Sequence, residues 1–168
     1  RGTVVTVGTF DGVHRGHRAV LREVCTRAES TGRRSVLLTF HPHPLKIVRP
    51  ERAPPLLTTP LEKKEILAET GLEYAVFVAF TPALSRFEPE RFVREVLVER
   101  VGVSELVIGY DHGFGRGRSG GTDTLRRLGR EIGFGVDVVE PVTTGEDAVS
   151  STSIREAIQD GAMETAAR

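Results

Sequence analysis

The chain has 168 residues, of which 39% are hydrophobic and 27% charged, the balance of a globular protein with enough residues for one buried core. Its 23 basic and 23 acidic side chains cancel, which argues against a nucleic-acid-binding protein that depends on bulk positive charge. One cysteine, no apolar run of membrane-spanning length and no signal-peptide pattern favour a cytoplasmic protein with no membrane partner and no nucleic-acid partner.

Apolar runs alternate with helical patterns along the chain. Strands are predicted at Thr3–Val7, Ser35–Phe40, Tyr74–Ala79, Glu105–Gly109 and Gly135–Glu140. Helices are predicted at His17–Ser30, Leu61–Thr70, Pro89–Val101 and Thr122–Ile132, with a last helix that starts near Ser151. Three of the strands are almost entirely apolar or β-branched, which is typical of a parallel sheet covered on both faces. The sequence therefore predicts a doubly wound α/β domain.

Two features concern the organisation of the chain. The segment Arg49–Pro60 contains four prolines and is predicted to be a long loop, either a lid over a site or a plain surface connection. The chain starts without methionine and stops inside a plausible helix, so we interpret residues 1–168 as one domain of a longer protein.

Four segments with unusual composition follow predicted strands. They are Gly8–His17, Thr39–Pro44, Gly109–Gly121 and Val149–Glu156. The first three hold all five histidines of the chain, namely His14, His17, His41, His43 and His112. Because ligands of open α/β sheets bind beyond the carboxyl ends of the strands, we expect these segments to form one shared site.

The first segment, GTFDGVHRGH, is a candidate phosphate site. Gly8 and Gly12 permit tight turns, and the N–H groups of the following helix start attract phosphate. His14 and His17 would lie beside that phosphate, where each can donate a hydrogen bond or carry charge. The segment is not a GxGxxG fingerprint, and no GxxxxGK[ST] motif occurs in the chain. A zinc site and histidines that merely pack remain as alternatives, although no cysteine cluster or HExxH accompanies them.

The last two segments give weaker signals. Ser150–Ser153 supplies more hydroxyl groups than one helix cap needs, and Arg155 is unfavourable near a helix start unless an anion is close, which favours phosphate binding. The third segment has six glycines among thirteen residues, so it is either a flexible surface loop or a backbone that folds around a ligand. In the second case Asp111 would accept hydrogen bonds, and Arg116 and Arg118 would face anions.

In this order, GTFDGVHRGH, TFHPHP, GYDHGFGRGRSGG and VSSTSIRE resemble the adenylyltransferase module of bacterial FAD synthetases, the bifunctional riboflavin kinase/FMN adenylyltransferases. The resemblance extends over essentially the whole chain. It implies a Rossmann-like nucleotidyltransferase fold with about five parallel strands and helices on both faces. It also implies the reaction of FMN with ATP to give FAD and pyrophosphate, with Mg²⁺ accompanying ATP. Residues 1–168 would be the FMN adenylyltransferase domain, and a covalently linked riboflavin kinase domain would follow Arg168.

The resemblance also assigns site residues. The catalytic residues would be His14, His17 and Arg155. The ATP-binding residues would be Gly8, Phe10, Asp11, Gly12, His14, His17, Ser151, Thr152 and Arg155. The FMN-binding residues would be Phe40, Pro42, His43, Asp111 and Phe114, while no metal ligand is assigned. Tyr110 and the pair His112-Gly113 depart from the family pattern, which affects the contacts of that loop.

Two other functions remain open. The chain could be a nucleotidyltransferase of the same fold that uses another phosphorylated or pantetheine-like acceptor. It could instead be a non-catalytic flavin or nucleotide sensor, although the two histidines, the hydroxyl cluster and Arg155 argue against this. Transfer by direct in-line attack needs no serine or cysteine nucleophile, so Cys25 is predicted to be chemically inert.

Overall fold

The computed structural model describes residues 2–110, 112, 120–144 and 147–167. Its main sheet has five parallel strands in the order β3-β2-β1-β4-β5. The strands are β1 (Thr3–Val7), β2 (Arg34–His41), β3 (Tyr74–Ala79), β4 (Val103–Gly109) and β5 (Gly135–Val139). The five predicted strands and their parallel pairing are thus confirmed. A short antiparallel pair, β6 (Thr143–Thr144) and β7 (Asp147–Ala148), was not predicted.

The α-helices are α1 (Arg15–Thr31), α2 (Pro44–Val48), α3 (Pro60–Ala68), α4 (Pro89–Phe92), α5 (Thr122–Ile132), α6 (Ser151–Gln159) and α7 (Met163–Ala167). The predicted helices are present as α1, α3, α4, α5 and α6, with most ends within two residues of the predicted ones, whereas α2 and α7 were not predicted. Short 3₁₀ turns are η1 (Pro50–Arg52) and η2 (Leu84–Arg86), and a π-helical stretch, η3 (Val93–Val101), continues α4. The helix predicted at Pro89–Val101 is therefore α-helical only in its first turn.

The start of α3 shows how local chemistry sets an element boundary. Thr59 accepts a hydrogen bond from the backbone N–H of Glu62, and the Glu62 side chain accepts one from the N–H of Thr59. This capping box, with Pro60 in the first helical position, starts the helix one residue before the predicted Leu61. The proline-rich segment thus ends in a fixed helix start, and it contains η1 as well.

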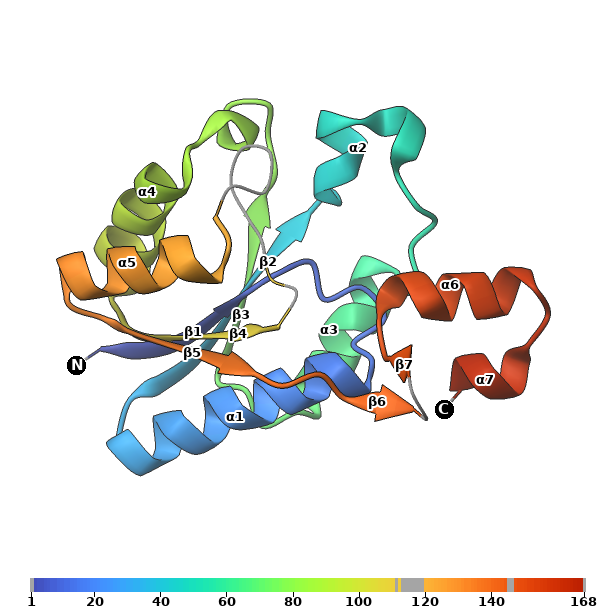
Figure 1. Cartoon of the computed structure of the whole chain (residues 1–168), viewed down its shortest axis with the longest axis horizontal. Coiled ribbons are helices and arrows are strands. Elements are labelled where there is room, and N and C mark those ends of the chain that lie inside the picture. Colours follow the sequence, from blue (N-terminus) through green and yellow to red (C-terminus); the bar gives the residue numbers. More distant parts are fainter. Residues whose placement is uncertain (1, 111, 113–119, 145–146, 168) are drawn as a thin grey trace.

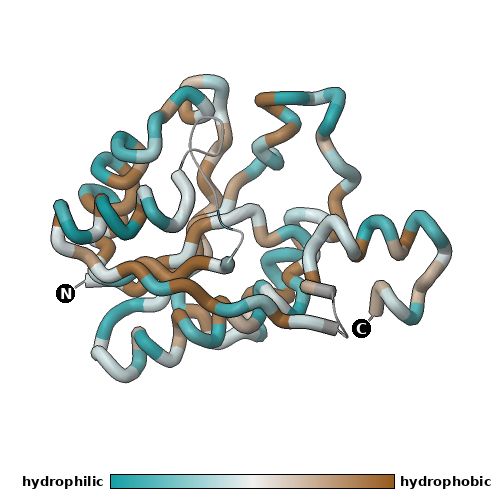
Figure 2. The backbone as a smooth tube through the Cα atoms, in the orientation of Figure 1, coloured by the Kyte–Doolittle hydropathy of each residue, from teal (hydrophilic) through white to brown (hydrophobic). Residues whose placement is uncertain are grey.

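Apolar side chains alternate between the two faces of the sheet and form two separate cores. Val4, Leu37 and Val107 lie in the core on the side of α1 and α3. Their neighbours along the strands, among them Leu38 and Ile108, lie in the core on the side of α4, η3 and α5. Figure 1 shows these helices on opposite faces of the sheet, and Figure 2 shows the hydrophobic strands between them. The predicted doubly wound α/β fold is confirmed.

The strand order also locates the expected binding crevice. From β1 the chain moves outward to β2 and β3 on one side, and later to β4 and β5 on the other. At such a reversal the connections leave in opposite directions, which opens a crevice at the carboxyl ends of the strands. In Figure 1, α2 and α6 lie beyond that edge.

Candidate functional site

The turn after β1 has an unusual backbone. Phe10, Gly12 and Val13 have φ angles of 47°, 79° and 38°, in the left-handed region that costs a non-glycine residue about 1–3 kcal/mol. Burial holds the two non-glycine residues in place, since Phe10 is 4% exposed and Val13 is 2% exposed in the core beside α1. At Gly12 a Cβ atom would lie 2.8 Å from Cδ1 of Leu57, so close approach of the proline-rich segment also requires glycine.

The two histidines of this turn form a stacked pair at the start of α1. His14 is the N-cap residue, and its Nδ1 accepts a hydrogen bond of 3.3 Å from the backbone N–H of His17. The ring centroids of His14 and His17 lie 3.6 Å apart, and the ring of Phe10 stacks on His17 at 4.5 Å. Because Nδ1 of His14 accepts, neutral His14 carries its proton on Nε2.

The surroundings of His17 favour its neutral form. Burial lowers its pKa well below the usual 6.5, and the nearby His14 and Lys63 lower the pKa further. Its Nδ1 atom is buried and has no hydrogen-bond partner among the residues that the structure describes. A buried ring nitrogen without a partner is costly, so a ligand atom that pairs with it would bind favourably there.

Asp11 connects three distant segments. Its buried carboxylate accepts hydrogen bonds from the backbone N–H groups of Leu57 (3.0 Å) and Thr58 (3.2 Å), and it forms an ion pair with Arg155 of α6. Its backbone carbonyl accepts a 2.9 Å hydrogen bond from the hydroxyl of Ser151. The first turn, the proline-rich segment and the start of α6 therefore meet at one residue.

Arg155 lies in this network with two protein partners. Its Nη2 donates to Asp11, and its Nε donates a 2.8 Å hydrogen bond to the carbonyl of Pro55. The sequence argument required an anion near this arginine, and in the structure the Asp11 carboxylate is that anion. Ser150 and Ser153 form a capping box at the start of α6, so part of the hydroxyl cluster does have the expected capping role.

The second segment lines the opposite side of the site. His43 caps α2, and its Nδ1 accepts a 3.2 Å hydrogen bond from the N–H of Leu45. Burial lowers the pKa of His43, so this imidazole is also biased towards the neutral form. Phe40 is 9% exposed and packs edge-on against Phe80 at 5.4 Å, while Pro42 follows a cis peptide bond.

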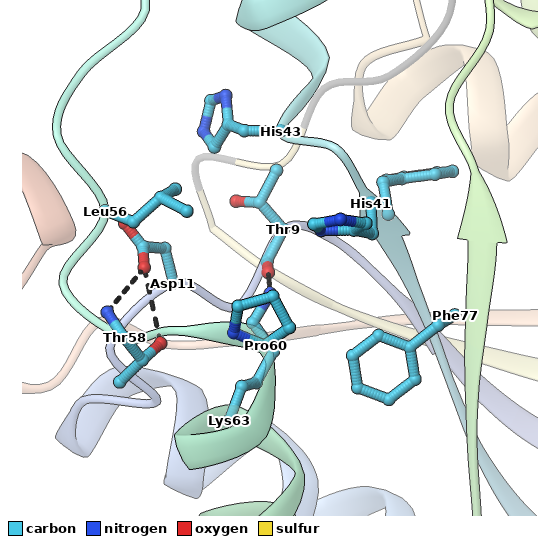
Figure 3. A pocket seen from close by; sticks show the side chains of 10 residues that line it. Thr9, Asp11, His41, His43, Leu56, Thr58, Pro60, Lys63 and Phe77 are labelled. Atoms are coloured by element: carbon cyan, nitrogen blue, oxygen red, sulfur yellow. Dashed lines mark hydrogen bonds between the residues drawn. The ribbon is translucent and has the colours of Figure 1, made fainter.

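A small pocket of about 20 Å³ joins these segments (Figure 3). It is lined by Thr9, Asp11, Phe40, His41, His43, Leu56, Thr58, Pro60, Lys63 and Phe77. The predicted residues His14, His17 and Arg155 are not among the lining residues, and of these three Arg155 contacts one of them, Asp11. The proline-rich segment supplies one wall and is fixed to Asp11 by hydrogen bonds.

Sequence reasoning missed Lys63, although it lies in the pocket. Only 9% of this residue is exposed, and its Nζ donates a 2.6 Å hydrogen bond to the carbonyl of Thr9. The residue types of the pair Lys63-Lys64 do not indicate which of the two lysines is buried. The available signal was helical spacing, because Lys63 lies four residues before the buried Leu67 and therefore shares its face.

Several residues with a predicted role lie outside the described part of the chain. Asp111 and Phe114, both predicted to bind FMN, lie outside the described residues, as do Arg116 and Arg118. The described residues contain no group of three or more His, Cys, Asp or Glu side chains that could hold a metal ion. Within the same residues, no helix is both long and apolar enough to cross a membrane.

Comparison with known proteins agrees with the resemblance seen in the sequence. The FAD synthetase family model matches residues 1–153. A bifunctional riboflavin kinase/FMN adenylyltransferase of Escherichia coli K12 is 35% identical over 159 residues, which are 95% of this chain and 51% of that protein. A putative bifunctional enzyme of the same name from Geobacillus thermodenitrificans is 37% identical, over 97% of this chain and 86% of its own. A FAD synthetase of Listeria monocytogenes is 35% identical, over 99% and 67%.

Structural comparison shows the same fold in a solved structure. A crystal structure titled as a macrolide-efflux protein from Streptococcus pneumoniae has a TM-score of 0.85 and 25% identity, and the match covers 99% of this chain and 55% of that chain. The chain spans about half the length of the E. coli relative that it matches. It corresponds to the N-terminal adenylyltransferase module of the bifunctional relatives, as the sequence motifs predicted. With its turn, histidine pair and parallel sheet, the chain therefore belongs to the FAD synthetase family, a family of nucleotidyltransferase enzymes.

Proposed function

We propose that this chain transfers the adenylyl group of ATP to FMN, forming FAD and pyrophosphate. A phosphate oxygen of FMN attacks the α-phosphorus of ATP, a new P–O bond forms, and the bond from the α-phosphorus to the oxygen of the β-phosphate breaks. The observation that carries the proposal is the convergence of the His14–His17 pair, Asp11 and Arg155 at the carboxyl edge of the sheet.

The residues of the site act mainly on charge. Two unit negative charges 4 Å apart repel by about 4 kcal/mol at an effective dielectric constant near 20, so bringing FMN to ATP needs compensating groups. The charge of Arg155 is balanced by Asp11, so Arg155 would act on the triphosphate through guanidinium N–H groups other than those that Asp11 and Pro55 accept, and the α1 start supplies backbone N–H groups. His17 enters as a neutral hydrogen-bond donor, because burial lowers its pKa. These groups stabilise the negative charge that moves onto pyrophosphate.

Mg²⁺ would enter with ATP. This ion keeps several waters and is commonly held by substrate phosphates with one or two carboxylates, rather than by a cage of protein ligands. Asp11 is the buried carboxylate nearest to this mode, but its oxygens already bind Arg155 and the N–H groups of Leu57 and Thr58, so the substrate phosphates and water would supply the ligands. When bound, Mg²⁺ supplies positive charge to the triphosphate. In the full-length protein we further propose that a linked riboflavin kinase domain, as named in the relatives, supplies FMN.

The test is an assay with ATP, FMN and MgCl₂. FAD fluorescence is internally quenched, so the flavin signal should fall while pyrophosphate is released in equal amounts. His17→Ala should lower kcat by about 100-fold or more, by analogy with the loss of one transition-state hydrogen-bond donor. Arg127→Met serves as a control, because Arg127 pairs with the exposed Glu131 one turn along α5.

Three results would contradict the proposal. Pyrophosphate release with another acceptor, but none with FMN, would indicate a different nucleotidyltransferase. Flavin binding without pyrophosphate release would indicate a sensor. Full activity of a folded His17→Ala variant would remove the histidine pair from the chemistry.

A further inference from the structure

Lys63 is a buried cation that lies outside the four sequence motifs that carry the family resemblance. It lies in the first turns of α3, and 9% of it is exposed. Among the described residues its ammonium donates one hydrogen bond, to the backbone carbonyl of Thr9, and that oxygen also accepts a bond from the Thr39 hydroxyl. Figure 3 shows the Lys63 side chain reaching from α3 towards Thr9, at the wall of the pocket.

The charge of this ammonium is incompletely balanced. An ammonium has three N–H donors, and a carbonyl is a neutral acceptor. Among the described residues no carboxylate lies within the 4.0 Å ion-pair distance of Lys63, and the nearby Asp11 is already bound by Arg155. Burial lowers the pKa of Lys63, and the Asp11 charge acts in the opposite direction. A buried ammonium with unused N–H donors destabilises the folded state unless an anion pairs with it, so binding of one more anion at Lys63 would be favourable.

The pocket indicates which anion this is. Lys63 shares the pocket with Phe40 and His43, the residues that the family resemblance connects with the flavin. The groups expected to hold ATP, which are His14, His17 and Arg155, do not line it. The cavity of about 20 Å³ is too small for a flavin ring, whereas the Lys63 ammonium at its wall is suited to a small anionic group such as a phosphate oxygen.

We propose that Lys63 binds the phosphate of the acceptor nucleotide and holds it beside the histidine pair. The proposal rests on the proposed function, because the acceptor is taken to be FMN. In this arrangement Lys63 neutralises the attacking phosphate, while Arg155, which Asp11 also binds, donates hydrogen bonds to ATP. The two anions that must meet are then each held by a separate cationic side chain.

The experiment compares two ligands that differ only in the phosphate. Dissociation constants of FMN and of riboflavin are measured by flavin fluorescence for the wild-type chain and for Lys63→Met. Loss of a charge-assisted hydrogen bond should weaken FMN binding by about 10-fold or more and leave riboflavin binding unchanged. Lys63→Arg, which keeps the charge, should retain part of the preference for FMN.

The matched control is Lys64→Met. It removes the same charge from the next position of α3, where the side chain is exposed and its Nζ lies 5.3 Å from the centre of the Phe77 ring. FMN binding should then stay within about twofold of wild type, since an exposed cation that lies over the Phe77 ring and does not itself line the pocket is screened by solvent and salt. The KM for ATP should change little in either variant, which separates an acceptor role from a general change in charge.

Several outcomes would overturn the proposal. Equal weakening of FMN and riboflavin would show that Lys63 only holds Thr9 in place. An unchanged FMN affinity in Lys63→Met would exclude a phosphate contact. Should Lys63→Met fail to fold by circular dichroism, Lys63→Gln is measured with the same two ligands, and the same criteria apply. If the wild-type chain makes FAD and the Lys63 variants bind FMN as tightly as the wild type does, this inference alone is refuted. If the wild-type chain makes no FAD, the proposed function is refuted.

Discussion

The ion pair between Asp11 and Arg155 should carry much of the stability of the site. Its side chains are 2% and 12% exposed, respectively, so neither charge can be solvated well without the other. Asp11→Asn keeps the size of the side chain and an oxygen for the N–H groups of Leu57 and Thr58, but it removes the negative charge. The guanidinium of Arg155 is then left buried and uncompensated.

Removal of one partner of a buried pair costs about 3–5 kcal/mol. For a domain of this size 1 kcal/mol corresponds to about 2–4 °C, so Asp11→Asn should lower Tm by roughly 6–20 °C. Urea denaturation of the variant at neutral pH measures the loss directly. Glu131→Gln is the matched control, because it breaks an exposed pair, with Arg127 50% and Glu131 46% exposed, and should cost less than about 1 kcal/mol.

A double-mutant cycle completes the test. Arg155→Met in the Asp11→Asn background removes the uncompensated charge and should recover part of the lost stability, which gives a favourable coupling free energy between the two sites. The reasoning is refuted if Asp11→Asn costs no more than Glu131→Gln. It is also refuted if the effects of the two substitutions simply add.

Three further predictions concern single side chains. Folding lowers the pKa of His17, so as pH falls below about 6.5 the unfolded chain takes up this proton before the folded chain does. The free energy of unfolding of the wild type should therefore decrease between about pH 7.5 and 5 more steeply than that of His17→Gln. Equal slopes in urea denaturation would contradict this. Arg155→Ala should raise the KM for ATP by about 10-fold or more, and an unchanged KM in a folded variant would exclude a triphosphate contact. Burial raises the pKa of the Cys25 thiol, so iodoacetamide should alkylate this thiol at pH 8 more slowly than it alkylates a free cysteine. Alkylation as fast as in the urea-unfolded chain would contradict the burial argument. Cys25→Ser should keep full activity.

The fold could be predicted from the sequence because its signals are local. Thr3–Val7, Tyr74–Ala79 and Thr122–Ile132 were predicted with the bounds that the structure shows. Each is a short apolar run or a periodic stretch with a clear end, such as Gly133 in a left-handed conformation after α5. The π-helical form of η3 could not be predicted in this way, since its apolar spacing is also compatible with an ordinary α-helix.

The candidate site could be predicted only in part. Glycine, histidine and hydroxyl residues after the strands indicate an anion site, because those residue types have few other reasons to gather there. The partner of Arg155 was missed, since a carboxylate 144 positions away leaves no trace in local sequence. Lys63 was missed for a related reason, because its burial depends on the packing of α3 against the first turn. Local chemistry thus reveals the kind of ligand, whereas the pairing of charges depends on tertiary contacts.

The separation of Asp11 and Arg155 also has a consequence for biosynthesis. These residues lie near opposite ends of the described chain, and Ser151 reaches the same turn from α6. A nascent chain on the ribosome can therefore assemble the sheet before it can close the site. The Asp11 carboxylate gains its guanidinium partner only when α6 has left the exit tunnel, and tight nucleotide binding should begin at that point of translation.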